Sequence, residues 1–297
     1  MLAAVIGATA VLPCAAMKYE RGHESQFVED RRGARPSKGK IAGLGIAGTI
    51  VALLVSRFLG VDVSQFIGGG SGAGEAAPIP ADQDPDRELK SFVSFVFDDA
   101  QSTWTKILPA TGTSYRMATM VLFTEAVNTK CGAADSGVGP FYCGGDEKVY
   151  IDLSFYRVLD QKLGAAGDFA QAYVIAHEVG HHVQRIMGEF DRAEAAAGGN
   201  EARKQDLSIR QELQADCFAG IWAFHTAKKD LLETGDIEEG LGAASAVGDD
   251  TLQRRATGQV QPETWTHGSS AQRMKWFRIG FDRGDFAACD TLAVATP

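Results

Sequence analysis

The segment AHEVGHHVQ, residues 176–184, holds three histidines and one glutamate within six positions of an otherwise apolar stretch. Before it, Asp168 and Gln171 have the spacing of an N-cap with a capping box, and Gly188 after it suits a helix C-terminus. We therefore predict one helix of roughly twenty residues. Either these groups surround a metal ion, or the helix merely carries several histidines.

His177 and His181 are four residues apart, so on a helix they share one face and can bind one Zn²⁺, with Glu178 beside them for a catalytic water. His182 lies about 100° around the helix from His181, and we interpret it as a structural or surface histidine. The small Gly180 would let another backbone approach closely. Because the H-E-x-x-H pattern also arises by chance, it needs a third ligand.

The segment RQELQADCFAGIWAF, residues 210–224, offers that ligand. Glu212 would complete a two-histidine, one-glutamate set with a fourth position open, as catalytic zinc requires. Asp216, four residues later, would accept a hydrogen bond from the second ring nitrogen of a ligand histidine. The alternative is two solvated acids, but the apolar neighbours indicate a buried helix, in which carboxylates need partners.

His267, in THGSSAQR (266–273), is the least constrained candidate. It would donate a hydrogen bond to the oxyanion that forms when a peptide carbonyl is attacked. Arg273 is expected to position either His267 or the helix that carries Asp216.

Charge is unevenly distributed along the 297 residues, whose formal net charge is −9. The first 60 residues hold 8 Lys/Arg and 4 Asp/Glu, so the remainder has 21 basic and 34 acidic side chains. A domain with this excess of acidic residues lacks the basic surface that nucleic-acid binding requires, and we exclude nucleic acid as a partner.

Five cysteines are present, none in a C-x-x-C pair, which argues against a zinc ribbon or a thioredoxin-like site. Cys131 and Cys143 bracket a short loop that a disulfide could close, and Cys217–Cys289 would follow by elimination. Two disulfides would indicate an oxidising compartment. Four buried free thiols are the alternative.

Residues 41–61 contain a single charge, Arg57, and as a helix would span about 31 Å, the hydrocarbon thickness of a bilayer. A buried core helix is the alternative. Residues 31–40 carry five Lys/Arg, whereas 62–88 carry six Asp/Glu and one Arg. The positive-inside tendency then predicts a single-pass membrane protein with a cytoplasmic N-terminus and an extracytoplasmic body, which in a bacterium would lie in the inner membrane.

The chain accordingly divides into four parts. Residues 1–40 form a basic cytoplasmic segment, 41–61 the transmembrane helix, 62–88 a Gly-rich flexible linker and 89–297 the body. If translation begins at Met17, residues 1–16 are the result of a misassigned start. Residues 115–127 and 148–156 are β-branched and aromatic and predict strands, while helical patterns dominate elsewhere. The expected fold class is α+β.

H-E-x-x-H followed by E-x-x-x-D resembles the gluzincin pattern, and the chain more closely resembles the bacterial YpfJ-like neutral zinc metallopeptidase family. The matching stretches are VEDRRG (28–33), GPFYC (139–143), VYIDLSFY (149–156), GDFAQAYVIAHEVGHHVQ (167–184), ELQADCFAG (212–220) and THGSSAQR. Residues 1–16 have no counterpart in the family, and the interval from His181 to Glu212 is longer than in secreted gluzincins.

The resemblance implies one membrane anchor and a zincin-like extracytoplasmic domain, in which His177, His181 and Glu212 bind one Zn²⁺ and Glu178 is catalytic. It also implies that KVYIDLSFY (148–156) is an edge strand above the active-site helix that aligns an extended peptide. The expected function is zinc-dependent endopeptidase. The alternatives are a zinc-stabilised binding module without turnover and a helical domain without metal, and other divalent ions could replace zinc.

Overall fold

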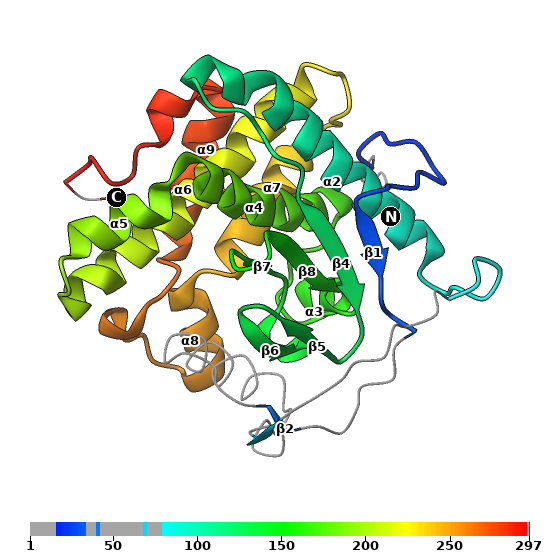
Figure 1. Cartoon of the computed structure of the whole chain (residues 1–297), viewed down its shortest axis with the longest axis horizontal. Helices are drawn as coiled ribbons and strands as arrows, with labels where there is room; N and C mark the ends of the chain where they lie inside the picture. The colour runs from blue at the N-terminus through cyan, green and yellow to red at the C-terminus, as the bar shows by residue number, and fades with distance from the viewer. Residues whose placement is uncertain (1–15, 34–39, 42–67, 70–78, 296) are drawn as a thin grey trace, which may run out of the picture.

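The computed structural model describes residues 16–33, 40–41, 68–69, 79–295 and 297, and it is mostly helical with small sheets (Figure 1). This confirms the α+β class. The helices are α2 (Arg87–Ile107), α3 (Phe155–Gln161), α4 (Asp168–Met187), α5 (Glu189–Ala197), α6 (Glu201–Ala227), α7 (Asp236–Ala246), α8 (Asp249–Thr257) and α9 (Ser270–Arg283). The strands are β1 (Val28–Asp30), β2 (Lys40–Ile41), β3 (Gly68–Gly69), β4 (Thr119–Phe123), β5 (Ala126–Thr129), β6 (Gly132–Asp135), β7 (Phe141–Cys143) and β8 (Lys148–Asp152).

Helix α4 occupies the centre of the helical part, with α2, α6 and α7 packed against it and the sheet on another side (Figure 1). It is apolar around most of its circumference, as a helix enclosed on all sides must be. Side chains such as Phe169, Ile175, Val179 and Val183 are at most 1% exposed. The segment with the candidate ligands is therefore part of the core.

The four-stranded sheet has the order β1-β4-β8-β7, with β8 parallel to β4 and antiparallel to β7. The predicted strand at 148–156 is a strand, β8, only over residues 148–152, whereas Phe155 and Tyr156 begin α3. Strand β8 lies between two neighbours. Its expected role as the edge strand is wrong, because the chain reverses direction between Cys143 and Lys148 and pairs β7 with the outer side of β8. Strand β7, residues 141–143, is the edge strand beside α4.

The N-terminal segment belongs to the same folded unit as the body. Strand β1 pairs in parallel with β4, and Met17 is 2% exposed in the main core. The side chain of Arg32 is 4% exposed and forms ion pairs with Asp30 and Asp84, whose side chains are also buried. The predicted division, with residues 1–40 as a separate cytoplasmic segment and the body starting at 89, is therefore wrong for residues 17–33.

The predicted transmembrane helix at 41–61 lies, apart from Ile41, outside the described residues, as do residues 1–15 and most of the predicted linker. In the part of the chain that the structure does describe, none of the helices is long and apolar enough to cross a membrane.

Both predicted disulfides are present. Cys131–Cys143 closes the β5–β6 hairpin onto β7, with a Cα–Cα distance of 5.8 Å. Cys217–Cys289 joins α6 to the C-terminal turn after α9, with a Cα–Cα distance of 5.7 Å. The alternative of four free thiols is therefore wrong.

Candidate metal centre

Helix α4 spans the predicted residues but begins differently from the prediction. Asp168 is its first residue and Gly167 its N-cap, and the Asp168 side chain does not cap the helix. Instead, the Phe169 N–H donates to Glu239 of α7 over 3.1 Å. The predicted capping box is therefore wrong, because a carboxylate distant in sequence takes its place. Gly188 ends the helix with φ 75°, as predicted.

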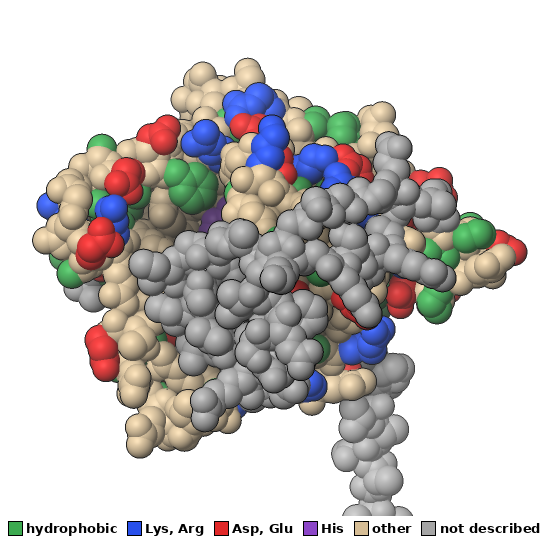
Figure 2. All heavy atoms as spheres, turned by 60° about the horizontal axis from the view of Figure 1, so that its bottom comes forward, with side chains coloured by type: hydrophobic (Ala, Val, Ile, Leu, Met, Phe, Trp, Pro, Cys, Tyr) green, Lys and Arg blue, Asp and Glu red, His purple; other side chains and the backbone are tan. Residues whose placement is uncertain are grey.

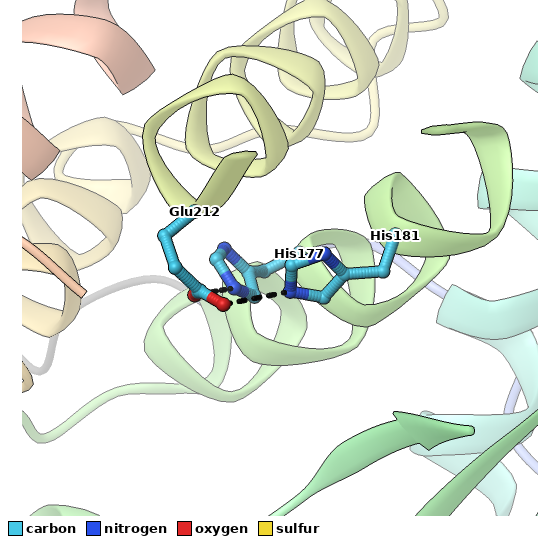
Figure 3. A group of neighbouring side chains, drawn as sticks. All are labelled: His177, His181 and Glu212. Carbon is cyan, nitrogen blue, oxygen red and sulfur yellow. Dashed lines mark hydrogen bonds and ion pairs between the residues drawn. The ribbon is translucent and has the colours of Figure 1, made fainter. Parts of the chain in front are cut away.

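His177 and His181 of α4 point toward Glu212 of α6 (Figure 3). The two glutamate oxygens lie 3.2 Å from Nε2 of His177 and 3.5 Å from Nε2 of His181. One ligand atom from each of the three residues lies within 4.8 Å of the others. The structure thus brings the three predicted ligands together.

The donor set fits zinc. Zn–N and Zn–O distances of about 2.0–2.1 Å in a tetrahedral arrangement place neighbouring ligand atoms roughly 3.3–3.4 Å apart. The two N–O separations, 3.2 Å to one oxygen of Glu212 and 3.5 Å to the other, are close to that value. Two imidazoles and one carboxylate supply three of the four positions, which is the pattern of a catalytic site.

The second nitrogen of His177 is fixed by Asp216. Nδ1 lies 2.9 Å from Oδ1 of Asp216, which is fully buried. Because a carboxylate only accepts, Nδ1 carries the hydrogen and Nε2 keeps its lone pair for a metal. Burial alone lowers the pKa of His177, but the charge and hydrogen bond of Asp216 raise it to about 9, so a metal competes with a proton there.

Asp216 is in turn held by Arg273 of α9. The sequence had left open whether Arg273 positions His267 or the helix of Asp216, and the structure shows its contact with Asp216. Two guanidinium nitrogens, Nε and Nη2, donate to the two carboxylate oxygens over 2.9 Å each. The Tyr173 hydroxyl also donates to Oδ1. All three residues are at most 4% exposed, so the bidentate pair is shielded from water and fixes the carboxylate.

His181 is oriented by an amide. Its Nδ1 lies 2.8 Å from Oε1 of Gln184, a residue that is fully buried. The amide nitrogen of Gln184 donates to the Gln211 carbonyl and to Gln214, so its oxygen is the acceptor toward His181. The hydrogen of His181 therefore sits on Nδ1, and Nε2 faces Glu212.

Gly180 sets the distance between α4 and α6. A Cβ there would lie 3.1 Å from the Ala215 carbonyl oxygen and 3.2 Å from its Cα, tighter than most real contacts. The absence of a side chain lets the two helices approach until Glu212 reaches the histidines, as the sequence suggested.

Glu178 is 7% exposed and lines the same cavity as the three ligands. Burial raises its pKa to about 7, because the ionised carboxylate is poorly solvated there; His177 lowers the pKa and Glu212 raises it further. A carboxyl group with a pKa near neutrality is suited both to take and to return a proton.

His267 also lines this cavity, and Asp249, at the start of α8, holds it in place. Oδ2 of Asp249 accepts the backbone N–H groups of Thr266, His267 and Gly268 over 2.8, 2.6 and 3.0 Å. Oδ1 lies 3.3 Å from Nδ1 of His267. Burial lowers the pKa of His267, but the Glu212 and Asp249 carboxylates raise it above its ordinary value, which favours the hydrogen-bond donor form.

His182 is structural, in keeping with its interpretation from the sequence. It is fully buried; Nε2 lies 2.7 Å from the Arg116 carbonyl oxygen and Nδ1 lies 3.0 Å from the Tyr142 hydroxyl. Since Tyr142 is in β7, His182 ties the edge strand to the active-site helix.

The three ligands, Glu178 and His267 all line one cavity of about 1020 Å³. Apolar side chains form much of its wall, among them Phe141, Phe155, Val174, Phe190 and Leu252. Figure 2 shows a histidine side chain deep in a recess of the surface. The volume is at the upper end of the roughly 300–1,000 Å³ that is usual for ligand pockets.

These features define a class: a mostly helical α+β protein with a buried two-histidine, one-glutamate centre beside a sheet edge. The chain belongs to the family described as "Putative neutral zinc metallopeptidase", whose model matches residues 17–292. It is 42% identical over 284 residues to the uncharacterized protein YpfJ of Escherichia coli, covering 93% of this chain and 99% of that protein. It is also 42% identical over 223 residues to uncharacterized proteins of Mycobacterium bovis and Mycobacterium tuberculosis, covering 71% of this chain and 73% of theirs. No solved structure matches the chain.

Three residues of the centre escaped sequence reasoning: Tyr173, Gln184 and Asp249. Tyr173 and Gln184 are four residues before His177 and three after His181, so the helical period would have placed them on the ligand face. Asp249 has no such signal, because it follows a separate helix and meets His267 only in the folded chain.

Proposed function

We propose that this protein is a zinc-dependent endopeptidase that works as zincins do. The observation that carries the proposal is the convergence of His177, His181 and Glu212, whose ligand atoms lie within 4.8 Å of one another, with Glu178 in the same cavity. Family membership supports the coarser statement that the chain is a zinc metallopeptidase.

A zinc ion bound there would polarise the scissile carbonyl and acidify the attacking water. Glu178 takes the proton from that water and returns it to the leaving amine, for which a pKa near 7 is well placed. His267, held by Asp249, donates a hydrogen bond to the oxyanion. Arg273, Asp216 and Gln184 hold the ligand imidazoles in one tautomer.

We propose that the substrate backbone pairs with β7 and not with β8, the strand that the sequence had indicated. Strand β7 pairs on one side with β8, and its residues Phe141 and Tyr142 line the cavity. An extended peptide would add to its other side by backbone hydrogen bonds, which bind a substrate with little regard to its side chains.

The proposed location is extracytoplasmic in a bacterium, supported by two disulfides, which persist in oxidising compartments. Association of residues 41–61 with the inner membrane stays a prediction, but a single crossing there would put residues 17–33 and the body on opposite sides, which the pairing of β1 with β4 does not allow. Because β1 and β4 share a sheet, residues 17–33 are proposed to lie on the same side of the membrane as the catalytic body, which revises the predicted cytoplasmic placement.

A zinc-stabilised binding module without turnover is the competing function, and Glu178 distinguishes the two. The test compares the chain with Glu178→Gln and Glu212→Ala variants, measuring bound zinc and cleavage of a peptide library. We expect about one zinc per chain in the parent and in Glu178→Gln, weakened binding in Glu212→Ala, and cleavage by the parent alone. Cleavage by Glu178→Gln at the parent rate would remove Glu178 as the base; no cleavage by any of them, with zinc bound, would favour the binding module.

A further inference from the structure

A second group of acidic side chains lies at the other end of α4 from the ligands. Asp168 at the start of α4, Asp236 at the start of α7 and Glu239 one turn later each offer a carboxylate oxygen within 4.8 Å of the others. We call these three residues the acidic cluster. Asp236 is fully buried and the other two are half-buried.

Helix ends explain part of this arrangement but not all of it. Carboxylates are favoured at helix N-termini, where they accept free backbone N–H groups. Glu239 accepts from Phe169, and Oδ2 of Asp236 accepts from Glu233 over 2.8 Å. Oδ1 of Asp236, however, is buried without a hydrogen-bond partner among the described residues. A buried carboxylate oxygen without a partner is costly, so this oxygen favours an additional donor.

Among the described residues, the cluster also has no counter-charge paired with it. Within the described ranges, no Lys, Arg or His side chain forms an ion pair with Asp168, Asp236 or Glu239. Burial, reinforced by the charge of Glu239, raises the pKa of Asp168 to about 6, and burial raises that of Asp236 to about 6. Three carboxylates in contact favour a bound cation.

The backbone nitrogen of Met17 lies at this cluster. The geometry of the next residue places this segment there: the Lys18 ammonium pairs with Glu233, whose backbone N–H donates to Asp236. The backbone N–H of Met17 is also one of the lesser influences that lower the pKa of Asp168. Met17 is 2% exposed, and its position is fixed by the next residue: the Lys18 N–H donates to the Leu231 carbonyl over 2.8 Å, and the Lys18 ammonium pairs with Asp230 and Glu233. As part of a longer chain this nitrogen is a neutral amide with one hydrogen. As a chain terminus it is an ammonium with three.

We propose that the functional chain begins at Met17 and that its α-ammonium group is the cation of the acidic cluster. A free terminus supplies the positive charge and the additional donors that Asp168, Asp236 and Glu239 otherwise lack. The match to the family model also starts at residue 17. Initiation at Met17 and cleavage after Ala16 would both produce this terminus. The ion pair would join the N-terminal segment, and hence β1, to the first residue of the helix that carries His177.

The first test is the mass and N-terminal sequence of the protein purified after expression of the whole reading frame from its own ribosome-binding region. We expect a chain that starts at Met17 with a free amine. Recovery of a folded chain that retains residues 1–16 would overturn the proposal.

The second test measures thermal unfolding of a chain that starts at Met17 and of one extended by Gly-Ser before Met17. Loss of the ammonium should lower the Tm by roughly 5–10 °C, the size expected for breaking one buried ion pair in a chain of this length. In a Glu239→Gln background the same extension should have a much smaller effect, because the partner charge is already reduced. An equal effect in both backgrounds, or none in either, would contradict the proposal.

Two further experiments determine whether the Met17 ammonium or a metal ion occupies the acidic cluster. The α-amine reacts with an acylating reagent near neutral pH more readily than lysine, because its ordinary pKa is about 7.7–8.0. We expect the Met17 amine to be protected in the native protein and labelled after unfolding, whereas the amine of the extended chain is labelled in both states. If Ca²⁺ instead binds stoichiometrically and raises the Tm of both chains equally, the cluster is a metal site and the terminus is not its occupant.

Discussion

Nδ1 of His177 and Oδ1 of Asp216 lie 2.9 Å apart in a fully buried contact that joins α4 to α6. This contact makes the metal centre depend on groups that do not touch the metal. Arg273 neutralises Asp216 from α9, so the orientation of one ligand imidazole depends on three helices. Partners of this kind commonly change metal affinity by about 10–100-fold.

We therefore expect Asp216→Asn to weaken zinc binding by about 10–100-fold, measured by competition with a chelator at fixed pH. The amide retains the shape of the carboxylate but loses the charge that orients His177 and pairs with Arg273. Glu201→Gln, a neutralisation on the same helix at a side chain that is 86% exposed, is the matched control and should leave the affinity unchanged. Equal affinities for both variants would show that Asp216 does not support the ligand.

The buried pairing of Arg32 with Asp30 and Asp84 leads to a prediction about stability. Hydrogen bonds from Arg32 and Lys90 overcome the effect of burial and lower the pKa of Asp30 to about 2. Arg32→Ala leaves two buried carboxylates with only Lys90 nearby, and we expect the free energy of unfolding in urea to fall by about 3–5 kcal/mol. Arg157→Ala, whose side chain is 63% exposed, should change it by less than about 1 kcal/mol.

The sign of the pH dependence follows from the lowered pKa of Asp30. Its stabilising contribution is complete above the unfolded-state value of about 3.9 and is lost as the pH falls through about 2. The stability difference between the parent and Asp30→Asn should therefore be largest near neutral pH and shrink between about pH 4 and pH 2. A difference that stays constant over this interval would contradict the assigned pairing.

The sequence predicted the metal centre better than the sheet. Ligand spacing on α4 and α6 follows from the helical period, so His177, His181 and Glu212 could be placed before any contact was known. Strand β1, with the residues Val28, Glu29 and Asp30, has no hydrophobic alternation. Ion pairs with Asp84 and Lys90, which are distant in sequence, hold this segment in place. The edge position of β7 could not be predicted either, because a segment of three residues is too short to show the alternation that defines a strand.

The Cys131–Cys143 disulfide yields a prediction about substrate binding. Cys143 is the last residue of β7, the strand proposed to pair with the peptide, and the bond fixes it to the β5–β6 hairpin. The double variant Cys131→Ser/Cys143→Ser should leave zinc affinity unchanged, since all ligands lie on α4 and α6, but should raise KM severalfold because the edge strand is less ordered before binding.

The control is Cys217→Ser/Cys289→Ser, which releases α6 from the C-terminal turn and should lower thermal stability with little effect on KM in the fraction that stays folded. Steady-state kinetics on a peptide from the library screen would separate the two effects. If the first variant loses zinc with KM unchanged, β7 does not hold the substrate, and the loop supports the metal centre instead.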